Sequence, residues 1–318
     1  MKKLILLLII LQSTLLLCQN RVNFSQYMHN HQIFNPGYVE DNNKHVGGSL
    51  LYRMQWMGFE GSPSTFIGNG FYNIKKHTFN LQLLSDNITI FRHLEAGLSY
   101  SYLVKLDRNT TMALGLKATY NQQSANYGAL TYFDAGDQAL SSSYRKSSVN
   151  FGGGVFVRNK DWYAGVGAPY IFNNKNVDAS TKLFNDISYS HLYVSGGYKV
   201  VDNFIYVLYP TALVKWTKGA PLSAGIDVNL IWNERIWGGI GYRTGNTAVF
   251  SIGVILKEDF KAVYSYDLGL GAVNRYGGMT HELSIGYGMN LYRSSFTQRK
   301  FTTRKMSIRK KQRRPRFH

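Results

Sequence analysis

The feature that most constrains this chain is a hydrophobic period of two, which recurs from about residue 46 to residue 292. In the last such segment Leu283, Ile285 and Tyr287 alternate with the small residues Ser284 and Gly286. Successive side chains of a β-strand point to opposite faces, so each segment has one apolar face and one small or polar face. The pattern predicts an all-β protein.

The length of the segments favours a membrane barrel over a soluble sandwich, in which strands also alternate. Many segments run for about ten residues or more, which suits a strand tilted across a membrane. We predict a transmembrane antiparallel β-barrel of about 14 strands, with a range of about 12 to 16. The predicted strands cover about residues 46–56, 64–74, 78–86, 93–106, 110–122, 148–158, 161–168, 187–200, 205–216, 221–233, 235–243, 247–257, 260–267 and 280–292.

Short and long connections alternate between these strands, as they do in outer-membrane barrels, where the short turns face the periplasm. An even number of strands then puts both ends of the chain in the periplasm. Pro210 lies within a predicted strand and weakens it, because proline cannot donate a ladder hydrogen bond. Tryptophans near strand ends predict interfacial girdles; they are Trp56, Trp162, Trp216, Trp232 and Trp237.

The first 18 residues have the composition of an export signal. Lys2 and Lys3 precede a short apolar stretch, and beyond residue 18 no run of 18 apolar residues occurs. We expect cleavage after Cys18; a lipoprotein with Cys18 as its first residue is the alternative. With a single cysteine, a disulfide within the chain is excluded.

The net charge of +18 is concentrated at the C-terminus. Residues 297–318 hold ten of the 36 Lys and Arg residues and no acid. We predict that residues 294–318 form a disordered basic periplasmic tail that attracts an anionic surface or an acidic partner, and not nucleic acid, which an exported protein seldom meets. A solvated extension without a specific role is the alternative. The tail residues named for this role are Arg299, Lys300, Arg304, Lys305, Arg309 and Lys310.

The interior of the predicted barrel requires polar contents. Its inward face holds charges of both signs, which a sealed apolar core would not tolerate; they are Glu95, Lys105, Lys117, Arg158, Lys199, Lys215, Asp227, Arg243 and Glu282. Residues 19–45 are polar and do not alternate, so we predict that they plug the lumen or lie at its periplasmic mouth. The predicted domains are a signal peptide (1–18), this plug-like segment (19–45), the barrel (46–293) and the tail (294–318).

Several motifs resemble one family. They are FSQYM at 24–28, FNPGY at 34–38, YRMQWMGFEGSPST at 52–65 and THELS at 280–284. In this order they resemble the PorP/SprF family of Bacteroidetes, although the family often has NPAYAG where this chain has NPGYVE. The resemblance marks the following residues as candidates for partner binding: Asn35, Pro36, Arg53, Gln55, Trp56, Gly58, Gly61, Pro63, Thr65, His281 and Glu282.

The resemblance implies an outer-membrane component of type IX protein secretion. Such a protein is expected to assist the export or surface docking of cargo, such as the adhesins of gliding motility. Its implied partners are outer-membrane lipids, secreted cargo, a periplasmic lipoprotein with a peptidoglycan-binding domain, and other secretion proteins. The alternative is a passive pore or a FadL-like transporter of small or lipidic solutes.

No catalytic, cofactor or metal site is predicted. His29 and His31 lack a third ligand nearby, and no Gly-x-Ser-x-Gly nucleophile block occurs.

Overall fold

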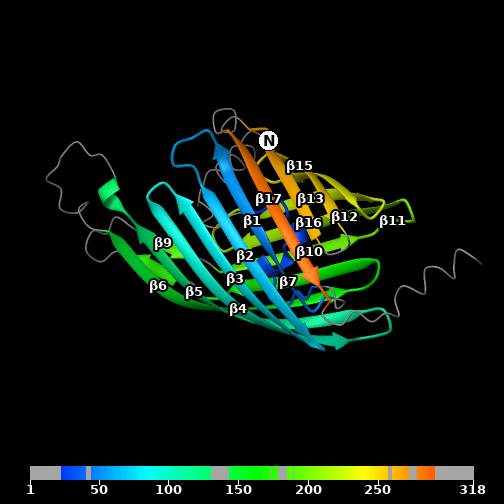
Figure 1. The fold of residues 1–318 in the computed structure, drawn as a ribbon. Coiled ribbons are helices and arrows are strands. Elements are labelled where there is room, and N and C mark those ends of the chain that lie inside the picture. Colours follow the sequence, from blue (N-terminus) through cyan, green and yellow to red (C-terminus); the bar gives the residue numbers. More distant parts are fainter. Residues whose placement is uncertain are drawn as a thin grey trace, which may run out of the picture.

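The computed structural model describes residues 23–40, 44–129, 143–172, 174–177, 185–188, 190–256, 260–271 and 278–290. Fourteen long strands form one antiparallel sheet that closes on itself (Figure 1). The strands are β1 (Val46–Met57), β2 (Ser64–Ile74), β3 (His77–Ile88), β4 (Phe91–Lys105), β5 (Thr111–Ala125), β6 (Tyr144–Arg158), β7 (Trp162–Tyr170), β10 (His191–Tyr198), β12 (Tyr206–Thr217), β13 (Ser223–Trp232), β14 (Ile236–Arg243), β15 (Thr247–Leu256), β16 (Phe260–Gly269) and β17 (Met279–Met289).

The barrel closes because its first and last strands pair. Tyr52 of β1 lies opposite Leu283 of β17, and Val194 of β10 lies opposite Val214 of β12. The remaining elements are the short strand β11 (Val201–Asp202), the hairpin of β8 (Asn174–Val177) and β9 (Asn185–Ser188), and the 3-10 turns η1 (Tyr27–His29), η2 (His31–Ile33) and η3 (Tyr127–Ala129). Among the described residues no helix is long and apolar enough to cross a membrane. The prediction of an antiparallel barrel of about 14 strands is confirmed.

Several predicted strand bounds are wrong. The segment predicted at 187–200 is divided between β9, β10 and a gap, while β5 and β6 extend further toward each other than expected. Pro210 lies within β12 and is tolerated there, opposite Val228 of β13. On the other side of β12, the pairing with β10 ends at Thr211 and the pairing with β11 covers only Val207 and Leu208, so Pro210 has no ladder partner to lose there.

The two ends of the barrel differ in their connections. One end carries short turns, such as residues 75–76, 159–161 and 233–235, and we call it the turn end. The other carries the connections 58–63, 126–143, 171–190 and 270–278, and we call it the loop end. The barrel strands begin at Val46 and finish at Met289, both at the turn end.

The two faces of the sheet are inverted relative to a soluble protein. Leu114 and Ile285 are exposed, whereas Thr119 and Ser284 are buried. Among the described residues, polar and charged side chains outnumber apolar ones in the buried set. An apolar outside around a polar interior is the arrangement of a transmembrane barrel.

All but one of the tryptophans lie on the exposed face of the sheet. Four of them are exposed near strand ends, namely Trp56, Trp162, Trp216 and Trp232. Trp237 is 1% exposed, and the prediction that it belongs to a girdle is wrong. It points into the barrel, where it packs edge-on against His29 and donates Nε1–H to the hydroxyl of Tyr209.

Candidate functional site

Residues 23–40 lie inside the barrel, where η1 and η2 can be seen in dark blue (Figure 1). Near the loop end, Lys215 donates to the side chain of Asn23. At the turn end, Arg158, the last residue of β6, donates to the carbonyls of Val39 and Glu40. We call residues 23–40 the interior segment, and it extends along the lumen from the loop half to the turn end.

The carboxylate of Glu282 binds the beginning of the interior segment. It accepts the backbone N–H groups of Ser25 (3.0 Å) and Gln26 (2.9 Å) and a hydrogen bond from Arg53 (2.8 Å). The side-chain amide nitrogen of Gln26 donates to the backbone carbonyls of Glu282 and Val263. The Ser284 hydroxyl donates to the side-chain oxygen of Gln26. Buried backbone polar groups need hydrogen-bond partners, and here the barrel wall supplies partners for this short irregular segment.

Asp267 extends this network to a second arginine. It accepts hydrogen bonds from Arg53 (2.9 Å), from Arg243 (2.8 Å) and from the hydroxyl of Ser25 (2.5 Å). Both arginines also donate to the Ser25 hydroxyl. We call this network the clamp; its members are Ser25, Gln26, Arg53, Arg243, Asp267 and Glu282.

The clamp is buried and balanced in charge. The side chains of Arg53, Asp267 and Glu282 are at most 4% exposed, and two cations face two anions. Buried ions cost several kcal/mol each in desolvation, so such a group is tolerated only when paired and hydrogen-bonded. The Ser25 hydroxyl and the backbone N–H groups of Ser25 and Gln26 supply some of the hydrogen bonds that these buried charges need. The interior segment is thereby coupled to the wall.

A different contact holds the middle of the interior segment. There Gly115 of β5, Gly154 of β6 and Gly167 of β7 face the backbone at Asn35 and Pro36. A Cβ on Gly115 would collide with the Pro36 carbonyl, and a Cβ on Gly154 would collide with the Asn35 side chain. We call these three glycines the cradle, because their missing side chains let two backbones approach closely.

Two hydrogen bonds fix the segment in the cradle. Ser101 donates to the Pro36 carbonyl at 2.7 Å, and the Asn35 amide donates to the Val155 carbonyl at 2.9 Å. Asn35 also accepts from the N–H of Gly37, which holds the local turn. The Asn-Pro motif is therefore a docking element inside the barrel.

The two histidines of the interior segment point to different walls. His29 packs on Trp237, while His31 lies among Tyr38, Phe156 and Tyr163. Burial lowers the pKa of each to about 3, with a smaller contribution to His29 from Lys261 and His31. Both are therefore neutral when the segment is docked. Among the described residues no group of three His, Cys, Asp or Glu side chains could hold a metal.

A second buried ion pair joins wall strands to one another. Lys117 of β5 lies 3.2 Å from Glu95 of β4 and donates to Gln82 of β3, and Tyr170 of β7 donates to Glu95. Both charged side chains are fully buried. These bonds join β3, β4, β5 and β7 to one another, and none of them involves the interior segment.

A small cavity lies between the interior segment and the wall near the clamp. This cavity, beside Asp227 and Lys215, measures about 30 Å³, room for one or two waters. At the turn end a larger open pocket of about 240 Å³ occurs. Its lining combines Met28, His31 and Tyr38 of the segment with wall residues that include Phe156, Arg158, Trp162, Tyr163, Lys199 and Tyr209.

The connection between β1 and β2 forms an exposed rim at the loop end. Trp56 has a φ of 56°, where L-residues are strained, and the β1–β17 register shifts between Met54 and Met57. Gly61, with a φ of 74°, accepts hydrogen bonds from the N–H and the hydroxyl of Thr89. The bulge and these bonds hold Trp56 and Phe59 exposed.

The structure separates the predicted site residues into three groups. Arg53, Thr65, Asn35, Pro36 and Glu282 are inside the barrel, where Thr65 donates to Asp86. The rim contains Gln55, Trp56, Gly58, Gly61 and Pro63. His281 is on the outer wall, 2.6 Å from the Tyr264 hydroxyl, and the basic tail and the signal sequence are outside the described residues.

Sequence reasoning did not identify Asp267, Ser25 or Gln26 as parts of one site. Asp267 has the parity of an inward-facing residue on β16, which is the signal that could have found it. Sequence reasoning also did not identify the cradle, because a glycine within a strand can mark a bulge, a bend or a close backbone approach. Of the inward-facing charges that were predicted, Lys105 is exposed instead, because it is the last residue of β4 at the turn end. Lys199, just beyond β10, is partly exposed and lines the turn-end pocket.

Comparison with known proteins identifies a family. The model of the "Type IX secretion system membrane protein PorP/SprF" family matches residues 17–287. No curated protein matches significantly.

Solved structures give the fold alone, because their sequence identities are low. The CymD monoaromatic hydrocarbon channel superposes with a TM-score of 0.51 at 10% identity, covering 85% of this chain and 94% of that one. The Acinetobacter baumannii outer membrane protein Omp33 (TM-score 0.46, 7% identity, 79% and 100% covered) and the Pseudomonas putida toluene transporter TodX (0.46, 9%, 81% and 93%) are also similar.

Proposed function

The chain belongs to the PorP/SprF family of type IX secretion system membrane proteins, and we propose that it is a closed docking barrel of that system. Its fold and family are those of an outer-membrane barrel. In this role it assists the export or surface docking of cargo proteins such as adhesins, and it links them to periplasmic secretion components. The role is non-catalytic.

One observation carries this proposal: the lumen is occupied by a segment that the wall binds through buried charges. The clamp and the cradle together hold residues 25–37, and the cavity beside the clamp admits only one or two waters. A channel for solutes would not need this many specific contacts to a segment in its path. The interior segment therefore acts as a plug, and the barrel acts through its two ends.

The loop end is the proposed site for cargo. The family resemblance is strongest in the block that forms the rim, and this block exposes Trp56 and Phe59 at the loop end. Exposed aromatic side chains on a rigid support are common anchors of protein interfaces. The strained backbone at Trp56 supports a functional reading, since strain of this kind concentrates at such sites.

The turn end is the proposed site for the periplasmic lipoprotein and other secretion components. Short turns face the periplasm in outer-membrane barrels, so both ends of the chain are periplasmic in this proposal. The pocket of 240 Å³ offers aromatic walls with Arg158 and Lys199 among its lining residues. The proposed basic tail, residues 294–318, begins beyond this end and adds long-range attraction to an acidic partner.

A second candidate function is the passage of small apolar solutes. The aromatic lining of the same pocket is the observation that favours it, because a small ring could bind there. Passage to the loop end would require the interior segment to leave its clamp. Solute flux through the reconstituted wild-type protein would support this candidate and contradict the first.

Affinity purification from the native outer membrane tests the docking proposal. We expect wild-type protein to recover type IX secretion components and exported cargo. Phe59→Ser at the rim should reduce recovery of cargo only, and Lys199→Glu at the pocket should reduce recovery of periplasmic components only. Recovery of neither class by correctly folded wild-type protein would contradict the proposal.

A further inference from the structure

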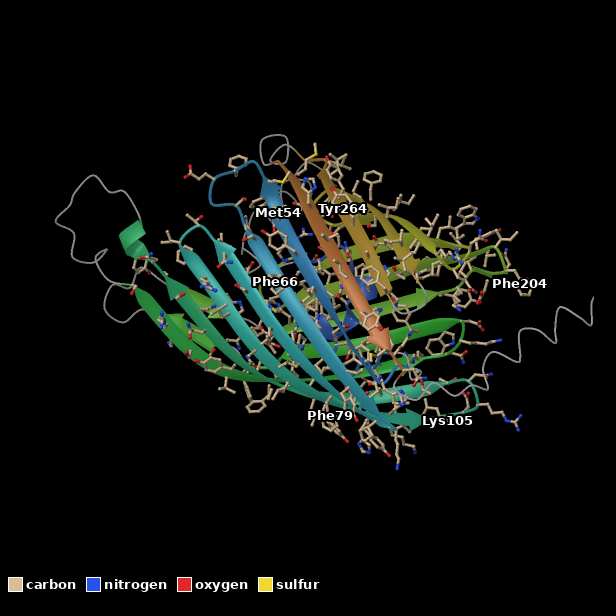
Figure 2. The ribbon with its side chains drawn as sticks, viewed as in Figure 1. Met54, Phe66, Phe79, Lys105, Phe204 and Tyr264 are labelled. Carbon is tan, nitrogen blue, oxygen red and sulfur yellow. The ribbon has the colours of Figure 1, made fainter. Side chains whose placement is uncertain are left out.

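An outward cluster of aromatic and basic residues lies at the turn end of β2–β4. The Tyr100 hydroxyl is 2.8 Å from His77 Nδ1, and the ring of Tyr102 lies 5.3 Å from that of His77. Lys75 and Lys76 form the adjoining β2–β3 turn and are exposed. Figure 2 shows Phe79, which packs on Tyr100, at this end of the barrel.

The cluster has the composition of a membrane–water interface. Tyrosines at the end of an apolar strand face sit at headgroup level, and lysines just beyond them reach the lipid phosphates. When the Tyr100 hydroxyl donates to His77 Nδ1, the ring proton is on Nε2, which is then a donor. Two ammonium groups and an imidazole N–H match the oxygens of a phosphate diester.

Lys75 occupies a backbone position that favours another residue. Its φ is 56°, in the left-handed region that tight hairpin turns usually fill with Gly or Asn. The turn is held against β4, because the N–H of Leu103 donates to the Lys76 carbonyl at 2.8 Å. A lysine in this backbone conformation is a local exception of the kind that occurs at functional sites.

The opposite end of the barrel contains a similar aromatic cluster without this charge. There the Tyr264 hydroxyl is 2.6 Å from His281 Nδ1, and Tyr266 packs edge-on against the same ring. Figure 2 places Tyr264 near Met54 at this loop end. The exposed side chains nearby in the described chain, such as Trp56 and Met279, are apolar. The two Tyr–His clusters thus differ mainly in the lysines.

We propose that Lys75, Lys76, His77, Tyr100 and Tyr102 bind the phosphate of an anionic glycerophospholipid in the periplasmic leaflet. The assignment to this leaflet rests on the proposed orientation, in which the turn end is periplasmic. The Tyr264–His281 cluster lacks lysines, so it is an interfacial anchor that does not select anionic lipid.

Lipid retention measured by native mass spectrometry tests this proposal. Purified full-length protein is mixed with phosphatidylglycerol, phosphatidylcholine or lipid A in detergent micelles. The test variant Lys75→Asn/Lys76→Gln removes both charges while Asn suits the backbone at residue 75. The matched control Lys160→Gln/Arg235→Gln removes two exposed cations from other turns at the same end. Heat-modifiable migration on gels verifies that each barrel is folded.

Wild-type protein and the control variant should retain phosphatidylglycerol in preference to phosphatidylcholine. The test variant should lose about fivefold in retention for each lysine removed. Equal losses in both variants would overturn the proposal by showing general charge attraction. Preference for lipid A, or equal retention of phosphatidylcholine, would also overturn it. The proposal would also be overturned if the test variant retained lipid as well as wild type but lost an acidic protein partner. The docking function is measured separately by partner recovery, so the two proposals fail independently.

Discussion

The clamp and the cradle hold the same segment by opposite means. At the clamp, four charged wall side chains form hydrogen bonds with Ser25 and Gln26. At the cradle, three wall residues contribute no side chain at all, and the backbone of Asn35 and Pro36 fits into the space. One contact depends on charge and the other on shape.

This difference determines what each contact can tolerate. A buried charge network is sensitive to the loss of one member, because the remaining charges stay buried without compensation. A close backbone approach is sensitive to the gain of a single methyl group and insensitive to charge. The clamp is thus the contact that a polar or electrostatic signal could release, and the cradle keeps the segment in register.

Arg53→Met should have the largest effect. It leaves Asp267 and Glu282 buried with only Arg243 nearby, at a cost of about 3–5 kcal/mol in segment docking and barrel stability. We expect the amide protons of residues 25–34 to exchange much faster with solvent. Lys199→Met, which breaks the exposed pair with Asp202, is the control and should change exchange little. Equal exchange in Arg53→Met and wild type would contradict the clamp.

Acid should loosen the interior segment between the clamp and the cradle. His29 and His31 have a pKa of about 3 when docked and near 6.5 when exposed, so above pH 6.5 both states are neutral. As pH falls from 6.5 toward 3, only the undocked state gains protons, and docking weakens by about 1.4 kcal/mol per histidine per pH unit.

Amide exchange at pH 7 and pH 5 measures this effect, which should amount to about 2 kcal/mol per histidine at pH 5. The variant His31→Phe keeps an aromatic ring among Tyr38, Phe156 and Tyr163 and should reduce the pH dependence. The clamp carboxylates are the same in both proteins, so the difference isolates His31. An unchanged pH dependence would contradict the burial of this ring.

Gly115→Ala should loosen the cradle without changing any charge. The new Cβ meets the Pro36 carbonyl, and overpacking of this kind costs about 1–3 kcal/mol. Faster exchange should be confined to residues near Asn35 and should leave the clamp end protected. Gly70→Ala is the control, because its Cβ would have no neighbour closer than 3.9 Å. Similar effects of the two substitutions would show that the cradle is not a close contact.

Ser101→Ala should have the smallest effect. It removes one hydrogen bond to the Pro36 carbonyl, worth about 0.5–1.5 kcal/mol, and leaves the glycines unchanged. A thermal unfolding comparison should place it well below Gly115→Ala in destabilisation. A larger loss for Ser101→Ala would mean that the cradle depends on hydrogen bonding and not on shape.

The sequence predicts the wall of this protein better than its interior. Alternation identifies the faces of Leu114 and Thr119 because a strand has a fixed period and lipid demands an apolar side. Alternation says nothing about which inward-facing groups meet. Arg53 and Asp267 are 214 residues apart and become neighbours only when β1, β17 and β16 pair.

The interior segment shows the same limit more strongly. Its polarity suggested the lumen, but its contacts depend on Gly115, Gly154 and Gly167, whose sequence context resembles that of other strand glycines. His281 illustrates the converse error of grouping by motif. It is adjacent to Glu282 in sequence, yet strand geometry sends the two side chains to opposite faces of the wall.

Electrical conductance across a planar lipid bilayer tests the central claim most directly. If the interior segment closes the lumen, purified wild-type protein should insert without steady conductance, and Arg53→Met should open ion-conducting pores. Lys199→Met should remain closed. Steady, porin-like conductance of the wild-type barrel, unchanged by Arg53→Met, would show that the segment neither closes the lumen nor depends on the clamp.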